Sequence, residues 1–155
     1  MRILLLGIFF YATVFEARSD DYYVSTKGND NGGDGTFSKP WRTLRFACSQ
    51  VSPDQGHTVK LSEGIFVELR VIVPPGVNIS GAGRDQTILK ADASFYHHPA
   101  DPGFSHEMFL IDLSSNSITT GNQSIKDITI DGDDKKLHGG IIVKNRTNIL
   151  IKRIK

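Results

Sequence analysis

Short segments with alternating apolar residues follow one another through this chain from Thr58 to its last residue. Val59 and Leu61 begin the series, and Gly, Asn and Asp separate one segment from the next. A period of two is typical of strands that bury one face. We therefore expect an all-β fold beyond Thr58. The other expected strands cover residues 71–73, 77–79, 87–90, 108–113, 125–130, 140–143 and 148–154.

The connections between these strands do not look like hairpins. Antiparallel hairpins favour Asn-Gly or Asp-Gly turns between matched strands, and neither Asp-Gly pair, at 34–35 or 131–132, has such flanks. A repeat is present instead: "VNISGAG" (77–83) resembles "ITIDGDD" (128–134), and "NILIKRI" (148–154) repeats the alternation. Coils of about 20–30 residues are typical of solenoids. The spacing predicts a β-solenoid, with residues 93–107 as an inserted loop.

One helix is expected before the strands. Thr43 or Ser38 is its candidate N-cap, and Pro53 and Gly56 follow its end. An extended segment (21–28) and a turn-rich segment (29–40) precede it. The apolar face, at i, i+3, i+4 and i+7, consists of Leu44, Ala47, Cys48 and Val51.

The first 17 residues have the pattern of a targeting segment. Arg2 precedes an apolar run at 3–15, which is shorter than the roughly 20 residues of a membrane span and fits the apolar region of a signal peptide. Ala17 is the candidate last residue of this segment, although Phe15 is bulky for a cleavage site. We expect a signal peptide at 1–17, a domain at 18–155 and secretion, with an uncleaved anchor as the alternative.

Charge and cysteine content exclude several classes. The net charge of +1 gives no support for nucleic-acid binding, which usually needs a basic patch. The single cysteine, Cys48, excludes an intrachain disulfide and a cysteine-based zinc cluster, and we expect a buried thiol there. Asn78, Asn122 and Asn145 begin N-glycosylation sequons, and turn-forming asparagines are the alternative interpretation.

Three segments in order resemble a known family. They are "YYVSTKGNDNGGDGTFSKPWRTLRFACSQ" (22–50), "HTVKLSEGIFVE" (57–68) and "VNISGAGRDQTILKAD" (77–92). Together they resemble the entry to the pectin-lyase-like right-handed parallel β-helix superfamily. The length from Val59 to Lys155 leaves room for about four coils. The resemblance implies a helix at 44–51 that caps the first coil and a domain truncated at its C-terminus. A short solenoid capped by a partner is the alternative.

The resemblance also implies a function. It suggests the N-terminal part of a secreted protein that acts on or binds an acidic polysaccharide, such as a pectate- or alginate-like uronan. The full-length form would use β-elimination or related chemistry, and the isolated chain is expected to be inactive. The alternative is a non-catalytic β-helix that binds glycan or protein. No catalytic or substrate-binding residue is assigned, and no metal.

An acidic cluster is the candidate cation site. Strand alternation predicts that Asp127, Thr129 and Asp131 share the outer face, and grouped carboxylates suit Ca²⁺, the one cofactor considered. A solvated turn is the alternative. The cluster also includes Asp133 and Asp134, and the nearby cations are Lys135, Lys152 and Arg153.

Other candidates carry weaker signals. Gly81 and Gly83 resemble the start of a dinucleotide fingerprint, but a strand follows them, so we expect a β-helix turn in which the two glycines allow positive φ. Asp30 and Asp34 lack the remaining EF-hand ligands and predict a turn. The inserted loop holds possible zinc ligands, without an HExxH spacing, and aromatic residues that could contact sugar: His97, His98, His106, Glu107, Phe95, Tyr96 and Phe104. A basic bias near the end suits an acidic polysaccharide or a soluble strand edge: Lys144, Arg146, Lys152, Arg153 and Lys155.

Overall fold

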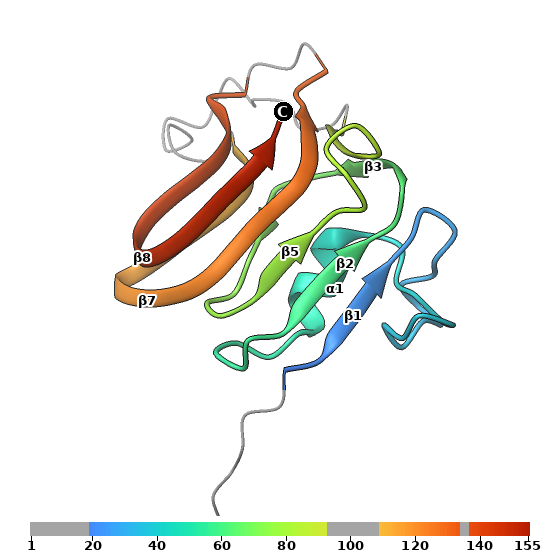
Figure 1. Ribbon diagram of the computed structural model, residues 1–155, viewed down its shortest axis with the longest axis horizontal. Helices are drawn as coiled ribbons and strands as arrows, with labels where there is room; N and C mark the ends of the chain where they lie inside the picture. Colours follow the sequence, from blue (N-terminus) through green and yellow to red (C-terminus); the bar gives the residue numbers. More distant parts are fainter. Residues whose placement is uncertain (1–18, 93–108, 134–136) are drawn as a thin grey trace, which may run out of the picture.

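The computed structural model describes residues 19–92, 109–133 and 137–155, which form parallel strands and one short helix (Figure 1). Every strand pair among these residues is parallel. The elements in chain order are β1 (Asp21–Val24), α1 (Leu44–Gln50), β2 (Thr58–Leu61), β3 (Gly64–Glu68), β4 (Val71–Ile72), β5 (Asn78–Ser80), β6 (Thr87–Ala91), β7 (Phe109–Asp131) and β8 (Gly139–Ile154).

The strands wind around three faces of a coil. The first face stacks β1, β2 and β5 on residues 123–126 of β7 and 149–152 of β8, which lie side by side in Figure 1. The second face stacks β3 and β6 on residues 128–131 of β7. The third face stacks β4 on the start of β7 and the start of β8. β7 and β8 turn between faces at positive-φ residues, among them Asp127 (φ 61°) and Arg153 (φ 53°).

The core is built from rows of inward side chains in register. On the first face Val59 pairs with Ile79, which pairs with Ile125, and all three are fully buried. Leu89 lies under Phe66 on the second face, and Ile111 lies under Val71 on the third. These rows explain the period of two in the sequence, because alternate residues of a strand point to the same side.

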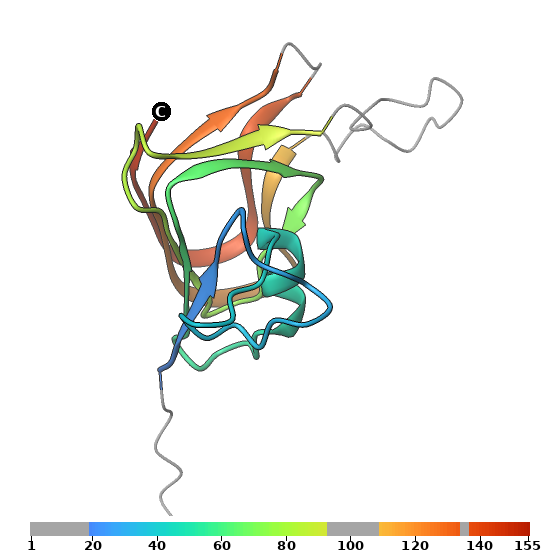
Figure 2. The same cartoon turned by 90° about the vertical axis from the view of Figure 1, so that its right-hand side faces the viewer.

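α1 covers the first coil. It packs against β1, β2, β3 and β4 with Leu44, Ala47 and Cys48 buried. The Thr43 side chain accepts a hydrogen bond from the Phe46 backbone N–H, so Thr43 is the N-cap. In Figure 2 the blue β1 and the teal α1 lie together at one end of the coil. The predicted capping helix is confirmed.

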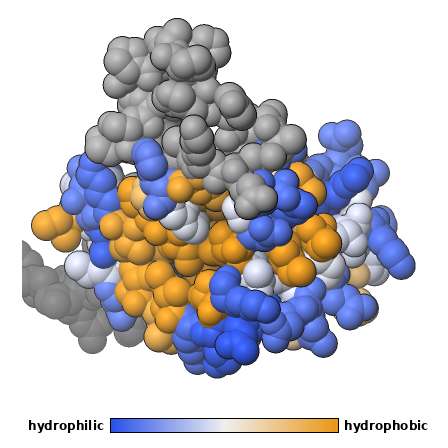
Figure 3. Space-filling view, turned by 90° about the horizontal axis from the view of Figure 1, so that it is seen from above, coloured by the Kyte–Doolittle hydropathy of each residue, from blue (hydrophilic) through white to orange (hydrophobic). Residues whose placement is uncertain are grey.

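Large apolar side chains are also exposed in several places. On the second face, Ile65 and Val67 of β3 point outward and are 56% and 53% exposed, and Figure 3 shows hydrophobic surface on this side. At β8 the inward row ends on Val143 and Ile151, which are 42% and 41% exposed.

The stacking differs from the predicted repeat. Ile79 pairs with Ile125, and Ile125 pairs with Ile151, whereas the sequence repeat aligned Ile79 with Ile130. Ile130 lies instead on the second face, beside Leu89. The repeat aligned segments with the same apolar alternation. However, the chain turns a corner at Asp127, so residues 128–131 lie on a different face from Ile79.

Two further expectations need correction. Gly81 and Gly83 are absent from the positive-φ glycines, and Gly81 is needed for space, since a Cβ there would lie 2.2 Å from the Asp127 carbonyl oxygen. The strand β3 was not expected. Its inward side chains are those of Phe66 and Glu68. Because Glu68 is a carboxylate, the strand does not show the alternation of apolar and polar residues that predicts a strand.

Some expectations fall outside the described residues. These are the signal segment at 1–17 and the whole inserted loop at 93–107. Within the described ranges, no helix is long and apolar enough to cross a bilayer.

Candidate functional site

The clearest polar groove lies on the third face, over β4 and the first residues of β7 and β8. It encloses about 350 Å³. Successive strands each contribute to it, because equivalent outward positions of stacked parallel strands lie next to one another. Its lining consists of Arg70, Ile72, Asp112, Ser114, Ser115, Asn116, Lys144 and Asn145.

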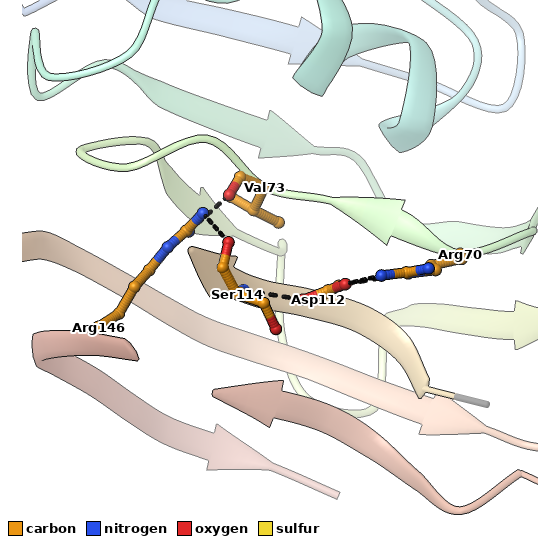
Figure 4. A network of polar contacts seen from close by, with 5 residues as sticks. All are labelled: Arg70, Val73, Asp112, Ser114 and Arg146. Carbon is orange, nitrogen blue, oxygen red and sulfur yellow. Dashed lines mark hydrogen bonds and ion pairs between the residues drawn. The ribbon is translucent and has the colours of Figure 1, made fainter. Parts of the chain in front are cut away.

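Asp112 and Arg70 form the centre of this groove (Figure 4). Arg70 donates from Nε to Asp112 Oδ2 at 2.9 Å, and its Nη2 also contacts that oxygen. The Ser114 backbone N–H donates to the other oxygen, Oδ1, at 2.8 Å. The Asp112 side chain is only 3% exposed, whereas that of Arg70 is 31% exposed. The carboxylate therefore anchors a guanidinium that still reaches solvent.

The ionisation of Asp112 follows from these contacts. Burial alone would raise its pKa, but the hydrogen bonds from Ser114 and Arg70 and the charge of Arg70 outweigh burial, so the pKa is lowered. Asp112 is therefore a carboxylate at neutral pH. A group held in this way is suited to orienting Arg70 and poorly suited to donating a proton.

Arg146 fixes the corner beside the groove. Its Nη1 donates to the Val73 carbonyl at 2.6 Å, and its Nη2 donates to the Ser114 carbonyl at 2.8 Å (Figure 4). Its Nε donates to Ser115 Oγ at 2.9 Å, and Nη1 also reaches Gln123 Oε1 at 3.1 Å. Partial burial lowers the pKa of Arg146, and these acceptors keep the guanidinium satisfied. Arg146 therefore holds β4, β7 and β8 together at one corner.

The open part of the groove presents cations and amides. Lys144 pairs in register with Ser114 and is exposed, as are Asn116 and Asn145. Asn145 donates from Nδ2 to the Ser115 carbonyl at 3.0 Å, which holds its side chain at the rim. The described lining has a net positive charge, because its two cations, Arg70 and Lys144, outnumber its single carboxylate, Asp112. Such a surface suits a ligand that combines carboxylates with hydroxyls.

The sequence did not single out Arg70 or Asp112. It flagged Lys144 and Arg146 through the basic bias near the end, and the structure places both at this groove. Arg70, Asp112 and Lys144 are far apart in the chain, so only the stacking of coils brings them together. A charged residue inside an apolar alternation, as at Asp112 in "FLIDL", was the available signal.

The acidic cluster is dispersed around a corner and a turn. Asp127, a corner residue, binds Arg153 through both carboxylate oxygens, and these contacts lower its pKa. Asp133 pairs with Lys90 at 2.7 Å. Among the described residues, no group of three or more His, Cys, Asp or Glu side chains could hold a metal ion, and Asp134 and Lys135 lie outside them.

The turn at 29–40 supports the helix. Asp30 accepts hydrogen bonds from the backbone N–H groups of Arg42 and Thr43 and from Thr43 Oγ1, whereas Asp34 bonds within the turn to Thr36. The sequence pattern predicted a simple turn at both residues. For Asp30 that was incomplete, because the coil folds the turn back onto the start of α1.

The remaining candidates have structural surroundings. Cys48 is buried, and burial raises its thiol pKa. Asn78 donates to the Gly56 and His57 carbonyls and accepts from Ser124, so it bridges neighbouring strands. Asn122 and Asn145 are exposed at positive φ, which fits turn-forming asparagines. His97, His98, His106, Glu107 and the loop aromatics Phe95, Tyr96 and Phe104 lie outside the described residues.

Comparisons with known proteins concern the fold. The sequence matches no protein-family model and no curated protein significantly. Among solved structures, a pectin methylesterase from carrot is similar, with a TM-score of 0.56 and 16% sequence identity. The likeness covers 84% of this chain and 38% of that chain, so this chain spans well under half of that protein's length. This chain has the right-handed parallel β-helix, pectin-lyase-like fold that its sequence predicted.

Proposed function

We propose that this chain recognises an acidic polysaccharide in the groove on the third face, with Arg70 and Lys144 pairing with uronate carboxylates. The observation that carries the proposal is the partly exposed Arg70, held by a buried carboxylate beside exposed Lys144. The pectin methylesterase with the same fold acts, by its name, on pectin, which supports this substrate class.

The groove offers the contacts that such a ligand needs. A guanidinium binds a carboxylate with two parallel N–H···O bonds, and Asp112 pre-orients Arg70, which reduces the entropy lost on binding. Asn116 and Asn145 supply amide donors and acceptors for sugar hydroxyls. Residues 1–17 would direct the protein to such a substrate outside the cell. Amino-terminal sequencing of the secreted protein tests this, and a start at Arg18 is expected.

For the longer protein, we propose β-elimination or related chemistry on the bound uronan. Cations next to the uronate carboxylate stabilise the charge that develops when the neighbouring carbon loses its proton. Arg70 would take that role. Lys144 of the described lining, in its neutral form, would take the proton as the base, while the glycosidic C4–O bond breaks and leaves an unsaturated sugar. Release of an unsaturated product, followed by ultraviolet absorbance, tests this step; the alternative of binding without turnover predicts no absorbance.

Binding by the chain is the first prediction to test. Isothermal calorimetry with polygalacturonate oligomers should show binding that Lys144→Ala weakens about 1.5- to fivefold, the range for loss of one exposed ion pair. Lys27→Ala, which removes an exposed lysine from a turn outside the groove, is the matched control and should bind as the parent does. Absence of binding at millimolar oligomer, or equal loss in both variants, would overturn the proposal.

A further inference from the structure

A second row of outward side chains crosses the first face of the coil. The register pairs Tyr23 with Lys60, Lys60 with Ser80, Ser80 with Lys126, and Lys126 with Lys152. These positions alternate with the buried Val59, Ile79 and Ile125, so they share the outer side of the strands. The strands that carry them lie side by side in Figure 1. We call Lys60, Lys126 and Lys152 the lysine row.

The lysine row is regular and positively charged. Neighbouring strands lie about 4.8 Å apart, so Lys126 and Lys152 are one strand spacing apart and Lys60 lies two spacings beyond Lys126. Lys60 pairs with Asp21 at 2.5 Å. Asp127, at the corner next to the row, is already paired with Arg153. The four cations, Lys60, Lys126, Lys152 and Arg153, thus outnumber the two acids.

An aromatic hollow continues the row beyond Lys60. It encloses about 390 Å³ and is lined by Tyr23, Phe37 and Pro40, among others. The Tyr23 and Phe37 rings meet edge to face with centroids 5.3 Å apart. Phe37 is 80% exposed, and Lys60 Nζ lies 5.9 Å from the Tyr23 ring centroid. Burying so exposed a ring against the apolar face of a sugar would be favourable.

We propose that the lysine row and the Tyr23–Phe37 hollow form a second binding surface, for a linear acidic polysaccharide that runs across the strands along the axis of the coil. The positive charge of the lysine row complements the negative charge of such a ligand. The spacing also fits, because each pyranose unit lengthens a sugar chain by about the distance between neighbouring strands. Nucleic acid suits the surface less well, since single strands need a stacking platform for successive bases and the described aromatic rings gather at one end.

This surface is separate from the proposed groove. None of the residues that line the groove belongs to the lysine row or to the hollow. Because the ligand lies along several coils, affinity should rise with oligomer length until the row is spanned. A ligand held by Arg70 and Lys144 in the groove would show no rise beyond the oligomer length that reaches both cations. The inference therefore does not rest on the proposed function.

The experiment measures the affinity of the whole chain for polygalacturonate oligomers of increasing length at low salt, by calorimetry. Lys126→Gln with Lys152→Gln should weaken the longest oligomer about tenfold, the sum of two modest ion pairs, and should flatten the length dependence. Lys27→Gln with Lys39→Gln removes the same charge from exposed turn residues and should leave the length dependence intact. Phe37→Ala should weaken oligomers about threefold or more, consistent with one lost stacking contact.

Several outcomes would overturn the proposal. One is equal loss of affinity in the two double variants, which would indicate attraction by net charge alone. Another is that single-stranded DNA binds as tightly as a uronan of similar charge, while Phe37→Ala does not change the affinity for either ligand. That result would indicate a surface that binds any polyanion. A third is a wild-type affinity that does not change with oligomer length. Failure of Lys144→Ala to weaken binding would count against the groove alone.

Discussion

Glu68 is a carboxylate that the fold buries beside the first turn of α1. It is 2% exposed and accepts hydrogen bonds from the backbone N–H groups of Leu44 and Arg45. Burial raises its pKa from 4.5 to about 7, although these two hydrogen bonds act in the opposite direction. The folded protein therefore keeps a proton on Glu68 that the unfolded chain gives up at lower pH.

The raised pKa of Glu68 determines how the stability of the folded protein changes with pH. The contribution of Glu68 to the free energy of unfolding should fall as pH rises from 4.5 to about 7, by at most about 3 kcal/mol. Glu68→Gln removes the titration, so the variant should gain stability relative to the parent across this window. Urea unfolding at several pH values measures it, with Glu63→Gln, on an exposed turn, as the control. A constant difference between Glu68→Gln and the parent would contradict the assignment.

At the scale of elements, α1 depends on a distant turn. The helix has seven residues, which is too short to be stable without tertiary contacts. Asp30 binds two backbone N–H groups at its start and the hydroxyl of its N-cap Thr43. The turn at 29–40 therefore positions the helix that covers the first coil.

Asp30→Ala should accordingly destabilise the protein. Loss of a carboxylate that satisfies three donors is expected to lower the free energy of unfolding by about 2 kcal/mol. Asp34→Ala is the matched control, because the Asp34 side chain bonds only to exposed Thr36 in the described contacts, and it should cost less than about 1 kcal/mol. Denaturant unfolding compares them, and equal losses would show that Asp30 has no special role at the helix.

At the scale of the whole molecule, the two ends of the described coil differ. α1 buries the first coil, whereas Val143 and Ile151 of β8 belong to the inward rows and remain substantially exposed. These inward side chains therefore present apolar surface to solvent along β8, and exposed apolar patches of this kind mark sites that bind other apolar groups.

Such a surface should bind a hydrophobic dye. Val143→Ser with Ile151→Ser is expected to reduce the fluorescence of bound anilinonaphthalene sulfonate by roughly half, because the apolar patch is interrupted. Ile118→Ser is the control, since Ile118 is 81% exposed on the segment between the first and third faces. Equal dye binding by the parent and the double variant would show that the surface is already covered, for example by a second copy.

Much of the architecture could be predicted from the sequence by itself. The alternation at Val59 and Leu61 marks β2, and the apolar spacing from Leu44 to Val51 marks α1, since burial of one face imposes the period of each element. Asp112, Glu68 and Asp30 could not be interpreted in the same way. Their roles depend on partners that lie 12 to 42 residues away along the chain.

The sequence by itself indicated most of the strands, the apolar face of the helix and a solenoid, and its resemblance to a known family implied a right-handed parallel β-helix. The tertiary structure decided which strands stack, that Ile79 lies on Ile125 rather than Ile130, and that Arg70, Asp112 and Lys144 share one groove. The physical reason is that backbone hydrogen bonds between strands are the same in every register, and one apolar side chain can replace another in the core. Several ways of stacking the strands are therefore compatible with the sequence. The lengths of the coils and the positive-φ corners select one of them, and only then do polar residues distant in sequence become neighbours.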